Sequence, residues 1–206
     1  MSIILLLLRL PILVVHILVG LFTILFFPKE PKNFKNSHYR IMMLWMNILS
    51  SILGIKIDIR GIPDQSANLF VSNHVTYLDI IIINKLLPVN FIAKEEISSW
   101  PVIGRLASKT GTLFIKRGDN VESSKMIYEM EERFKLKNKI VFFPEGKIGN
   151  GKRVRKFHYK LFKSIENKEL YIQPIAIRYP SGYPINNNYS EIISDKSLKG
   201  EMFSLY

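Results

Sequence analysis

The chain has 206 residues and a formal net charge of +12, enough residues for one domain with a sizeable core plus an anchoring segment. It contains no cysteine, which excludes disulfides, thiolate nucleophiles and cysteine-based zinc sites. The mean hydropathy of +0.12 is high for a freely soluble domain. The excess of basic residues favours an anionic partner, such as a phospholipid surface, a phosphorylated substrate, an acidic carrier or nucleic acid.

An apolar stretch opens the chain, from Ile3 to Phe27, and carries only Arg9 and His16 as ionisable residues. It reaches the ~20 apolar residues that a membrane-spanning helix needs. No basic residue precedes it and no small-residue cleavage site follows it, which argues against a cleaved signal peptide. Several lysines follow instead. Because positive charge favours the inner side, we expect the remainder of the chain to lie at the cytoplasmic face of the inner membrane.

A second apolar segment, Arg40 to Ile55, is short for a span and predicts a helix that lies in the membrane interface or packs on the domain. Two arrangements stay open: one true span, or a two-helix element embedded in one leaflet, since Arg9 would be costly at mid-bilayer. We expect membrane-anchoring helices over residues 1–54 and a single domain over residues 55–206.

Strands and helices alternate after residue 55. The apolar patterns predict strands at 55–61, 68–74, 89–93, 111–118, 139–146 and 171–180, and helices at 77–87, 100–110 and 120–137. A loop is expected at 184–190. This alternation predicts an α/β fold with a mixed, mostly parallel sheet flanked by helices. In such sheets, functional side chains gather in the loops beyond the strand ends.

The stretch "VSNHVTYLD", residues 71–79, has two interpretations. Thr76 and Asp79 have the spacing of a capping box, in which Asp79 would bond the backbone at the start of a helix. Alternatively, Asp79 folds back to accept a hydrogen bond from one ring nitrogen of His74, whose other nitrogen then serves as a general base. No serine or cysteine nucleophile is obvious nearby, so such a base would activate a substrate hydroxyl.

Two further stretches carry candidate binding residues. In "GTLFIKRGD", Lys116 and Arg117 are adjacent on an expected strand and face opposite ways, and a guanidinium suits a phosphate. In "VFFPEGKIGNG", Glu145 can accept hydrogen bonds from substrate hydroxyls, while Gly146 lets a ligand approach the backbone. The plainer alternatives are a solvated charge at a strand end and a tight turn with an exposed acid. The second stretch lacks the Gly-Lys-Ser/Thr of a P-loop.

A basic run with interleaved aromatic residues, "KRVRKFHYKLFK", spans residues 152–163. It could contact lipid head groups, a nucleotide-bearing donor, an acidic carrier protein or nucleic acid, or it could be a solvated basic face. The chain has four histidines and no HExxH motif, so we expect no metal site.

Together these blocks resemble the glycerolipid acyltransferase family, in particular bacterial 1-acyl-sn-glycerol-3-phosphate acyltransferases. The family's His-x4-Asp block is matched by Asn73, His74 and Asp79, and its second block resembles residues 111–117. The third block, Phe-Pro-Glu-Gly, is intact at residues 143–146, and the fourth resembles the strand around Pro174. The order and spacing match over about residues 55–180.

The resemblance implies that His74 deprotonates the acceptor hydroxyl, which attacks an acyl thioester, and that Asp79 orients His74. It also implies that Arg117 binds the acceptor's phosphate. The expected substrate-binding residues are Asn73, Arg117, Glu145 and Gly146. The implied partners are membrane lipids, lysophosphatidic acid or a similar lysolipid, and acyl-CoA or acyl carrier protein as donor. No cofactor, metal or nucleic acid is implied.

Some residues depart from the family pattern. Lys147-Ile148-Gly149 replaces the small polar residues that usually follow the third block. Residues 149–162 resemble a Gly-x-Arg-Val-x-x-Phe continuation found in a subgroup with lyso-ornithine lipid acyltransferases. Lysophosphatidic acid is therefore the expected acceptor, and lyso-ornithine lipid or another lysolipid is the alternative. An alternative of another class is a catalytically silent membrane-surface binding protein. Because the family usually continues beyond the position of Tyr206, we expect a short or truncated member.

Overall fold

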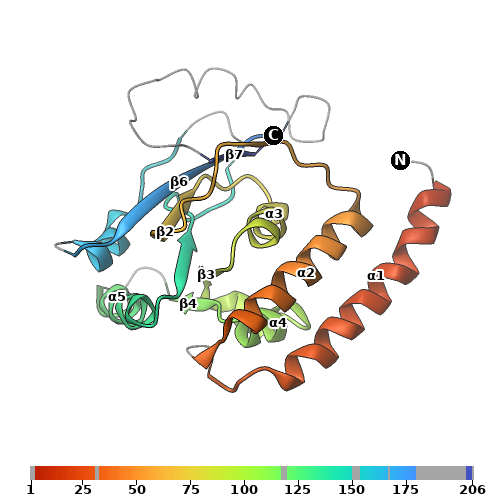
Figure 1. The fold of residues 1–206 in the computed structure, drawn as a ribbon, viewed down its shortest axis with the longest axis horizontal. Helices are drawn as coiled ribbons and strands as arrows, with labels where there is room; N and C mark the ends of the chain where they lie inside the picture. The colour runs from red at the N-terminus through yellow and green to blue at the C-terminus, as the bar shows by residue number, and fades with distance from the viewer. Residues whose placement is uncertain are drawn as a thin grey trace. The chain divides into compact units, whose positions relative to one another are not determined.

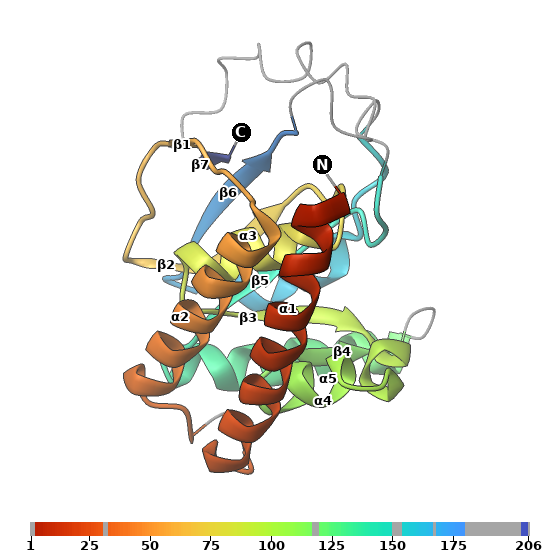
Figure 2. The same cartoon turned by 90° about the vertical axis from the view of Figure 1, so that its right-hand side faces the viewer.

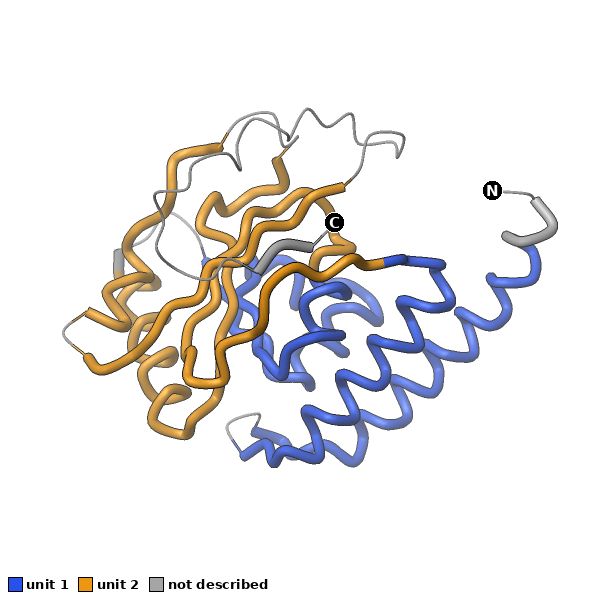
Figure 3. Tube along the Cα trace, turned by 45° about the horizontal axis from the view of Figure 1, so that its top comes forward, with its two compact units in different colours: residues 1–56, 80–116 blue, residues 57–79, 117–206 orange. Residues whose placement is uncertain are grey.

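The computed structural model describes residues 3–30, 33–116, 120–149, 154–166, 168–179 and 203–205. The chain divides into two compact units, which Figure 3 colours separately: unit 1 holds residues 1–56 and 80–116, and unit 2 holds residues 57–79 and 117–206. The boundary expected at residue 55 lies next to the first of these divisions, but residues 80–116 group with the N-terminal segment. The separation into an anchor and a domain stays a prediction.

Unit 1 begins with a helical hairpin. Helix α1 (Ile3–Thr23) continues into the short 3-10 helix η1 (Ile24–Phe26), and helix α2 (Asn36–Leu53) runs back beside α1 (Figures 1 and 2). Within the described residues, one stretch, Leu7–Phe26, is long and apolar enough to cross a bilayer, with a mean hydropathy of 2.3. Its leucines are largely exposed, for example 63% at Leu7 and 70% at Leu25. The predicted apolar N-terminal helix is thereby confirmed.

The polar side chains of α1 are turned toward α2. His16 Nε2 lies 3.1 Å from the carbonyl oxygen of Trp45, and Trp45 Nε1 donates to the carbonyl oxygen of His16 at 3.2 Å. The two rings stack with their centroids 4.6 Å apart. The Arg9 guanidinium approaches Gly54, which caps α2, to 2.8 Å from the position that a Cβ would take. Since both groups face a neighbouring helix, they do not stand on the exposed apolar side of α1.

The rest of unit 1 alternates helix and strand. Helix α3 (Leu78–Leu86), whose first two residues belong to unit 2, is followed by strand β3 (Val89–Lys94), the 3-10 helix η3 (Glu95–Ser99), helix α4 (Ile103–Lys109) and strand β4 (Leu113–Ile115). Strands β3 and β4 are parallel. The buried Asn90 of β3 joins these parts, because its Oδ1 accepts the Tyr39 hydroxyl at 2.9 Å and its Nδ2 donates to the Thr110 carbonyl at 3.0 Å.

Unit 2 is built on a sheet of mixed, mostly parallel strands. Its strands are β1 (Ile59–Arg60), β2 (Ala67–Ser72), β5 (Lys139–Phe142), β6 (Tyr171–Ile177) and β7 (Phe203–Leu205). They lie in the order β1-β7-β6-β2-β5, and only the β1–β7 pair is antiparallel. Strand β2 is hydrogen-bonded on both sides, and its consecutive residues Leu69 and Phe70, which point to opposite faces of the sheet, are both buried, at 0% and 1% exposure. The predicted α/β fold is confirmed.

Helix α5 (Asn120–Lys135) packs beside β5 and against the 3-10 helix η4 (Tyr159–Ile165). Met126, Met130 and Phe134 recur every four residues along α5 and are buried, as expected for the apolar face of an amphipathic helix. An ion pair at 2.6 Å joins Lys168 to Glu131 of α5, and both side chains are partly exposed. The helix at 120–137 was predicted from this pattern. The 3-10 helix η4, which begins within the basic run of residues 152–163 and ends at Ile165, was not predicted.

Gly104 in α4 lies where no side chain fits. A Cβ at this position would be 2.2 Å from the carbonyl oxygen of Ser98 and 2.6 Å from that of Ile97. Because these are backbone atoms, we predict that Gly104→Ala lowers the free energy of unfolding by about 1–3 kcal/mol. An Ala in place of Gly in a free helix would instead stabilise it. Denaturation of the detergent-solubilised protein measures the change. The control is Ser108→Ala, on the exposed side of the same helix, which should change stability by less than about 0.5 kcal/mol. A wild-type stability for Gly104→Ala would contradict the close packing.

Candidate functional site

The segment that joins β2 to α3 brings His74 and Asp79 together within unit 2. His74 Nδ1 lies 2.8 Å from Asp79 Oδ2. The His74 side chain is 12% exposed, whereas that of Asp79 is fully buried. When Nδ1 donates to the carboxylate, Nε2 at the opposite edge of the ring is the nitrogen that can accept a proton. The arrangement is that of a general base and the acid that orients it.

The same Asp79 carboxylate also begins helix α3. Its Oδ2 accepts hydrogen bonds from the backbone N–H groups of Val75 at 2.6 Å and Thr76 at 3.0 Å. The backbone N–H of Leu78 points at the Thr76 hydroxyl at 3.4 Å. The capping interpretation and the histidine-orienting interpretation are therefore not exclusive, because one oxygen serves the helix start and the imidazole together.

The second oxygen of Asp79 is also occupied. Tyr179 donates its phenol O–H to Asp79 Oδ1 at 2.6 Å. Tyr179 lies two residues beyond β6, one of the two strands that pair with β2. The sequence analysis missed this residue. The available signal was its place after a buried strand, since parallel neighbours end at the same edge of a sheet.

The Phe-Pro-Glu-Gly block follows β5, the other neighbour of β2, and this block and the loop after it each contact His74 once. The Phe143 ring stacks on the His74 ring with centroids 3.9 Å apart and planes 12° from parallel. The backbone N–H of Gly149, in the loop after the block, donates to the His74 carbonyl at 2.8 Å. These contacts fix one face of the imidazole and its backbone. Phe143 was part of a predicted motif, but its contact with His74 was not predicted.

Glu145 and Gly146 form a tight turn directly after β5. The Gly146 N–H donates to the Phe143 carbonyl at 2.9 Å, and Gly146 has φ +68°, in the left-handed region that favours glycine. Glu145 is only 7% exposed, and its Oε2 accepts the backbone N–H of Arg155 at 3.2 Å. The turn thus carries a buried carboxylate and not the exposed acid of the plainer alternative. A role for these two residues in substrate binding stays a prediction.

The side-chain amide of Asn73 forms two hydrogen bonds with the neighbouring strand β6. Its Nδ2 donates to the carbonyl of Ile177 at 2.9 Å, and its Oδ1 accepts the Ile177 N–H at 2.7 Å. The side chain thereby imitates a strand backbone and joins the ends of β2 and β6 beside His74. These contacts give Asn73 a structural role, and its predicted substrate contact stays a prediction.

The remaining candidates are Arg117 and the basic run of residues 152–163. Arg117 falls outside the described residues, and its neighbour Lys116 is exposed after the end of β4. In the basic run, residues 154–160 are all exposed, including Phe157 at 47% and Tyr159 at 64%. This segment is tied to the Phe-Pro-Glu-Gly block by the backbone of Arg155 and by the His158 N–H, which donates to the Pro144 carbonyl at 2.8 Å.

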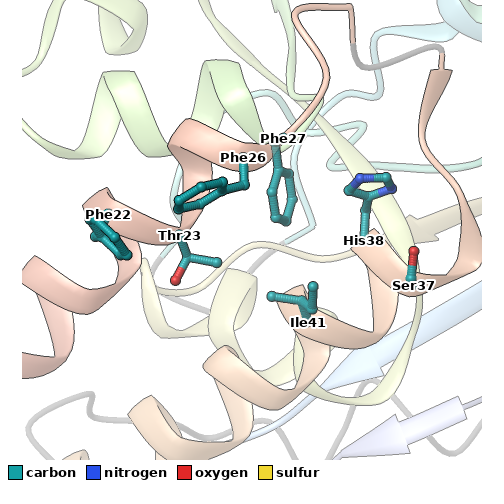
Figure 4. Close-up of a pocket in the computed structure, with 7 residues that line it drawn as sticks. All are labelled: Phe22, Thr23, Phe26, Phe27, Ser37, His38 and Ile41. Atoms are coloured by element: carbon teal, nitrogen blue, oxygen red, sulfur yellow. The ribbon is translucent and has the colours of Figure 1, made fainter.

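The described residues contain no group of three histidine, aspartate or glutamate side chains that could hold a metal ion. A pocket of ≈ 280 Å³ lies within the helical hairpin of unit 1, where α1 and η1 end and α2 begins (Figure 4). It contains none of the predicted site residues. Its lining residues are Phe22, Thr23, Phe26, Phe27, Ser37, His38 and Ile41.

Comparison with known proteins places these blocks in a family. The model of the Acyltransferase family matches residues 56–178, more than half of the chain. The chain belongs to the acyltransferase family. The resemblance inferred from the four sequence blocks is therefore confirmed, and no solved structure shows a significant match.

The curated relatives carry two kinds of name. The chain is 34% identical over 140 residues to the lyso-ornithine lipid O-acyltransferase of Pseudomonas aeruginosa, covering 68% of the chain and 54% of that protein. It is 30% identical over 141 residues to the 1-acyl-sn-glycerol-3-phosphate acyltransferase of Neisseria meningitidis, covering 68% and 55%. It is 30% identical over 148 residues to the enzyme of that same name from Helicobacter pylori, covering 70% and 62%. The chain thus spans about half the length of the curated relatives it matches.

We predict that Asn73→Ala lowers the free energy of unfolding by about 1–3 kcal/mol, because it removes two hydrogen bonds from the partly buried backbone of Ile177. Asn68→Ala is the matched control. Asn68 also lies on β2 and accepts one hydrogen bond from the β6 backbone, the Tyr171 N–H at 3.2 Å, but at an exposed position. Its loss should cost less than about 1 kcal/mol. Chemical denaturation compares the two variants, and equal losses would contradict the role assigned to Asn73.

Proposed function

We propose that the chain is a membrane-attached O-acyltransferase that moves a fatty acyl group from a thioester donor to the free hydroxyl of a lysophospholipid. The observation that carries this proposal is the 2.8 Å contact between His74 Nδ1 and the buried Asp79 carboxylate, in a chain of the acyltransferase family. A serine or cysteine nucleophile is not required, because the acceptor lipid supplies the attacking hydroxyl.

The proposed reaction proceeds in two proton transfers. His74 Nε2 removes the proton from the acceptor hydroxyl while the hydroxyl oxygen attacks the thioester carbonyl carbon. The tetrahedral intermediate then collapses, the C–S bond breaks, and the imidazolium gives its proton to the departing thiolate sulfur. The Asp79 carboxylate stabilises the imidazolium and holds its ring in place, and Phe143 covers one ring face.

The proposed acceptor is 1-acyl-sn-glycerol-3-phosphate, which gives phosphatidic acid in phospholipid synthesis. In this proposal Arg117 binds the phosphate, and Glu145 with Gly146 lines the glycerol site next to Asn73 and His74. Lyso-ornithine lipid is the second candidate, favoured by the 34% identity to the P. aeruginosa relative of that name and by the continuation after the third block. Both acceptors offer a free hydroxyl beside a long acyl chain, so the base chemistry is common to them.

The proposed location is the cytoplasmic face of the inner membrane. The apolar stretch Leu7–Phe26 supports attachment to lipid, and the lysines that follow it support this orientation. The proposed donor is acyl-CoA or acyl carrier protein, both of which are anionic. The exposed basic and aromatic residues of segment 154–160 suit such a donor or the anionic head groups around it.

We predict thioester consumption that requires lysophosphatidic acid. Purified protein in vesicles is given acyl-CoA with lysophosphatidic acid, with lyso-ornithine lipid or with neither, and released thiol is followed with a thiol reagent. The chain has no cysteine, so the protein adds no background. Release with lyso-ornithine lipid alone would move the function to the second acceptor. If no thiol is released with acyl-CoA or with acylated acyl carrier protein as donor, the enzyme proposal is contradicted and a membrane-surface binding protein is favoured.

We predict that Arg117→Ala slows acylation of lysophosphatidic acid by about 10- to 100-fold, the usual effect of losing a hydrogen bond to a charged group. Acylation of a lysolipid without this phosphate should change far less. Lys116→Ala is the matched control, since Lys116 is the adjacent basic residue and is exposed. An equal loss with all acceptors would show that Arg117 does not select the phosphate.

A further inference from the structure

Four donors surround the fully buried Asp79 carboxylate. Oδ2 accepts the N–H groups of Val75 and Thr76 and faces His74 Nδ1, while Oδ1 accepts the phenol of Tyr179 at 2.6 Å. Such a short distance is typical of an O–H that donates to a charged carboxylate. The helix cap and the imidazole both use Oδ2 alone. The contact with Tyr179 therefore serves neither of them directly.

Three donors hold Oδ2 in place, whereas the orientation of the carboxylate plane also depends on what Oδ1 contacts. The Tyr179 hydroxyl fixes Oδ1, and this fixes the plane in which Oδ2 points at Nδ1. Tyr179 is itself held by the sheet, because Asn73 clamps both backbone groups of Ile177 two residues earlier. The contacts thus form a continuous series from the end of β6 through Tyr179 and Asp79 to His74.

We propose that Tyr179 is a positioning residue for the His74–Asp79 pair, which acts by holding the Asp79 carboxylate in the orientation that His74 requires. The expected effect on the rate rests on the proposed function. The expected effect of Tyr179 on the contact between Asp79 and His74 does not depend on turnover. Tyr179 touches Asp79 and need not touch substrate. Its loss should therefore slow the chemical step and leave substrate binding unchanged.

The kinetic test is Tyr179→Phe in the full chain in lipid vesicles. We expect kcat to fall about tenfold, with KM for the thioester and for the lysolipid unchanged. Tyr171→Phe is the matched control, because it removes the same hydroxyl from the first residue of β6, at a position that is 61% exposed. It should keep wild-type kcat. An unchanged kcat in Tyr179→Phe, or a rise in KM alone, would overturn the inference.

A double-mutant cycle separates positioning from a general structural role. In the Asp79→Asn background the carboxylate is gone, so Tyr179→Phe should reduce kcat little further. If Tyr179 only stabilised the fold, its removal would cost the same factor in both backgrounds. Equal factors would therefore overturn the inference.

A spectroscopic measurement decides the inference even if no acceptor is acylated. The chain has four histidines, so nitrogen-15 labelling of histidine gives few imidazole signals, and loss of one in His74→Gln identifies His74. We expect Tyr179→Phe to shift the His74 Nδ1 signal and Tyr171→Phe to leave it in place. An unchanged His74 Nδ1 signal in Tyr179→Phe would overturn the inference. A shifted signal in a protein that acylates no acceptor would contradict only the proposed function.

Discussion

The burial of one carboxylate organises this site. Asp79 has no exposed surface, and a charge removed from water is costly unless hydrogen bonds replace the lost hydration. Three of the replacements come from the segment between β2 and α3, namely the N–H groups of Val75 and Thr76 and the imidazole of His74, and the fourth is the Tyr179 hydroxyl from the segment after β6. The hydrogen bonds that satisfy the buried Asp79 carboxylate thus also hold His74 in position.

The parallel order of strands makes this arrangement possible. Strand β2 lies between β5 and β6 and runs parallel to both, so all three end at the same edge of the sheet. His74 follows β2, Phe143 follows β5 and Tyr179 follows β6. Residues separated by about 70 and 100 positions in the chain consequently meet at the His74–Asp79 pair, Phe143 at His74 and Tyr179 at Asp79. Because its backbone is hydrogen-bonded on both sides of β2, the sheet gives this edge the rigidity that the proposed general base, His74, would need.

Much of this could be predicted from local patterns. The alternation of apolar runs gave the elements of the α/β fold, and the spacing of His74 and Asp79 gave both roles of the carboxylate. The pattern could not reveal which strands are neighbours, and the contacts of Tyr179, Phe143 and Asn73 depend on that. Of the strand expected at 55–61, only Ile59–Arg60 is a strand, and these two residues pair with Leu205 and Ser204 of β7. Arg117 lies outside the described residues, so its assignment still rests on the motif.

The central claim is that His74 is the base in acyl transfer to a lysolipid hydroxyl. The most direct measurement is the rate at which His74→Gln, compared with wild type, forms the diacyl product from acyl-CoA and lysolipid in vesicles. Glutamine is polar and similar in size to histidine but cannot take a proton from a hydroxyl, so folding and vesicle binding should persist while the base is lost. The account predicts a rate at least about 100-fold lower, as expected for loss of a general base. Product formation near the wild-type rate by a folded, membrane-bound His74→Gln would contradict it.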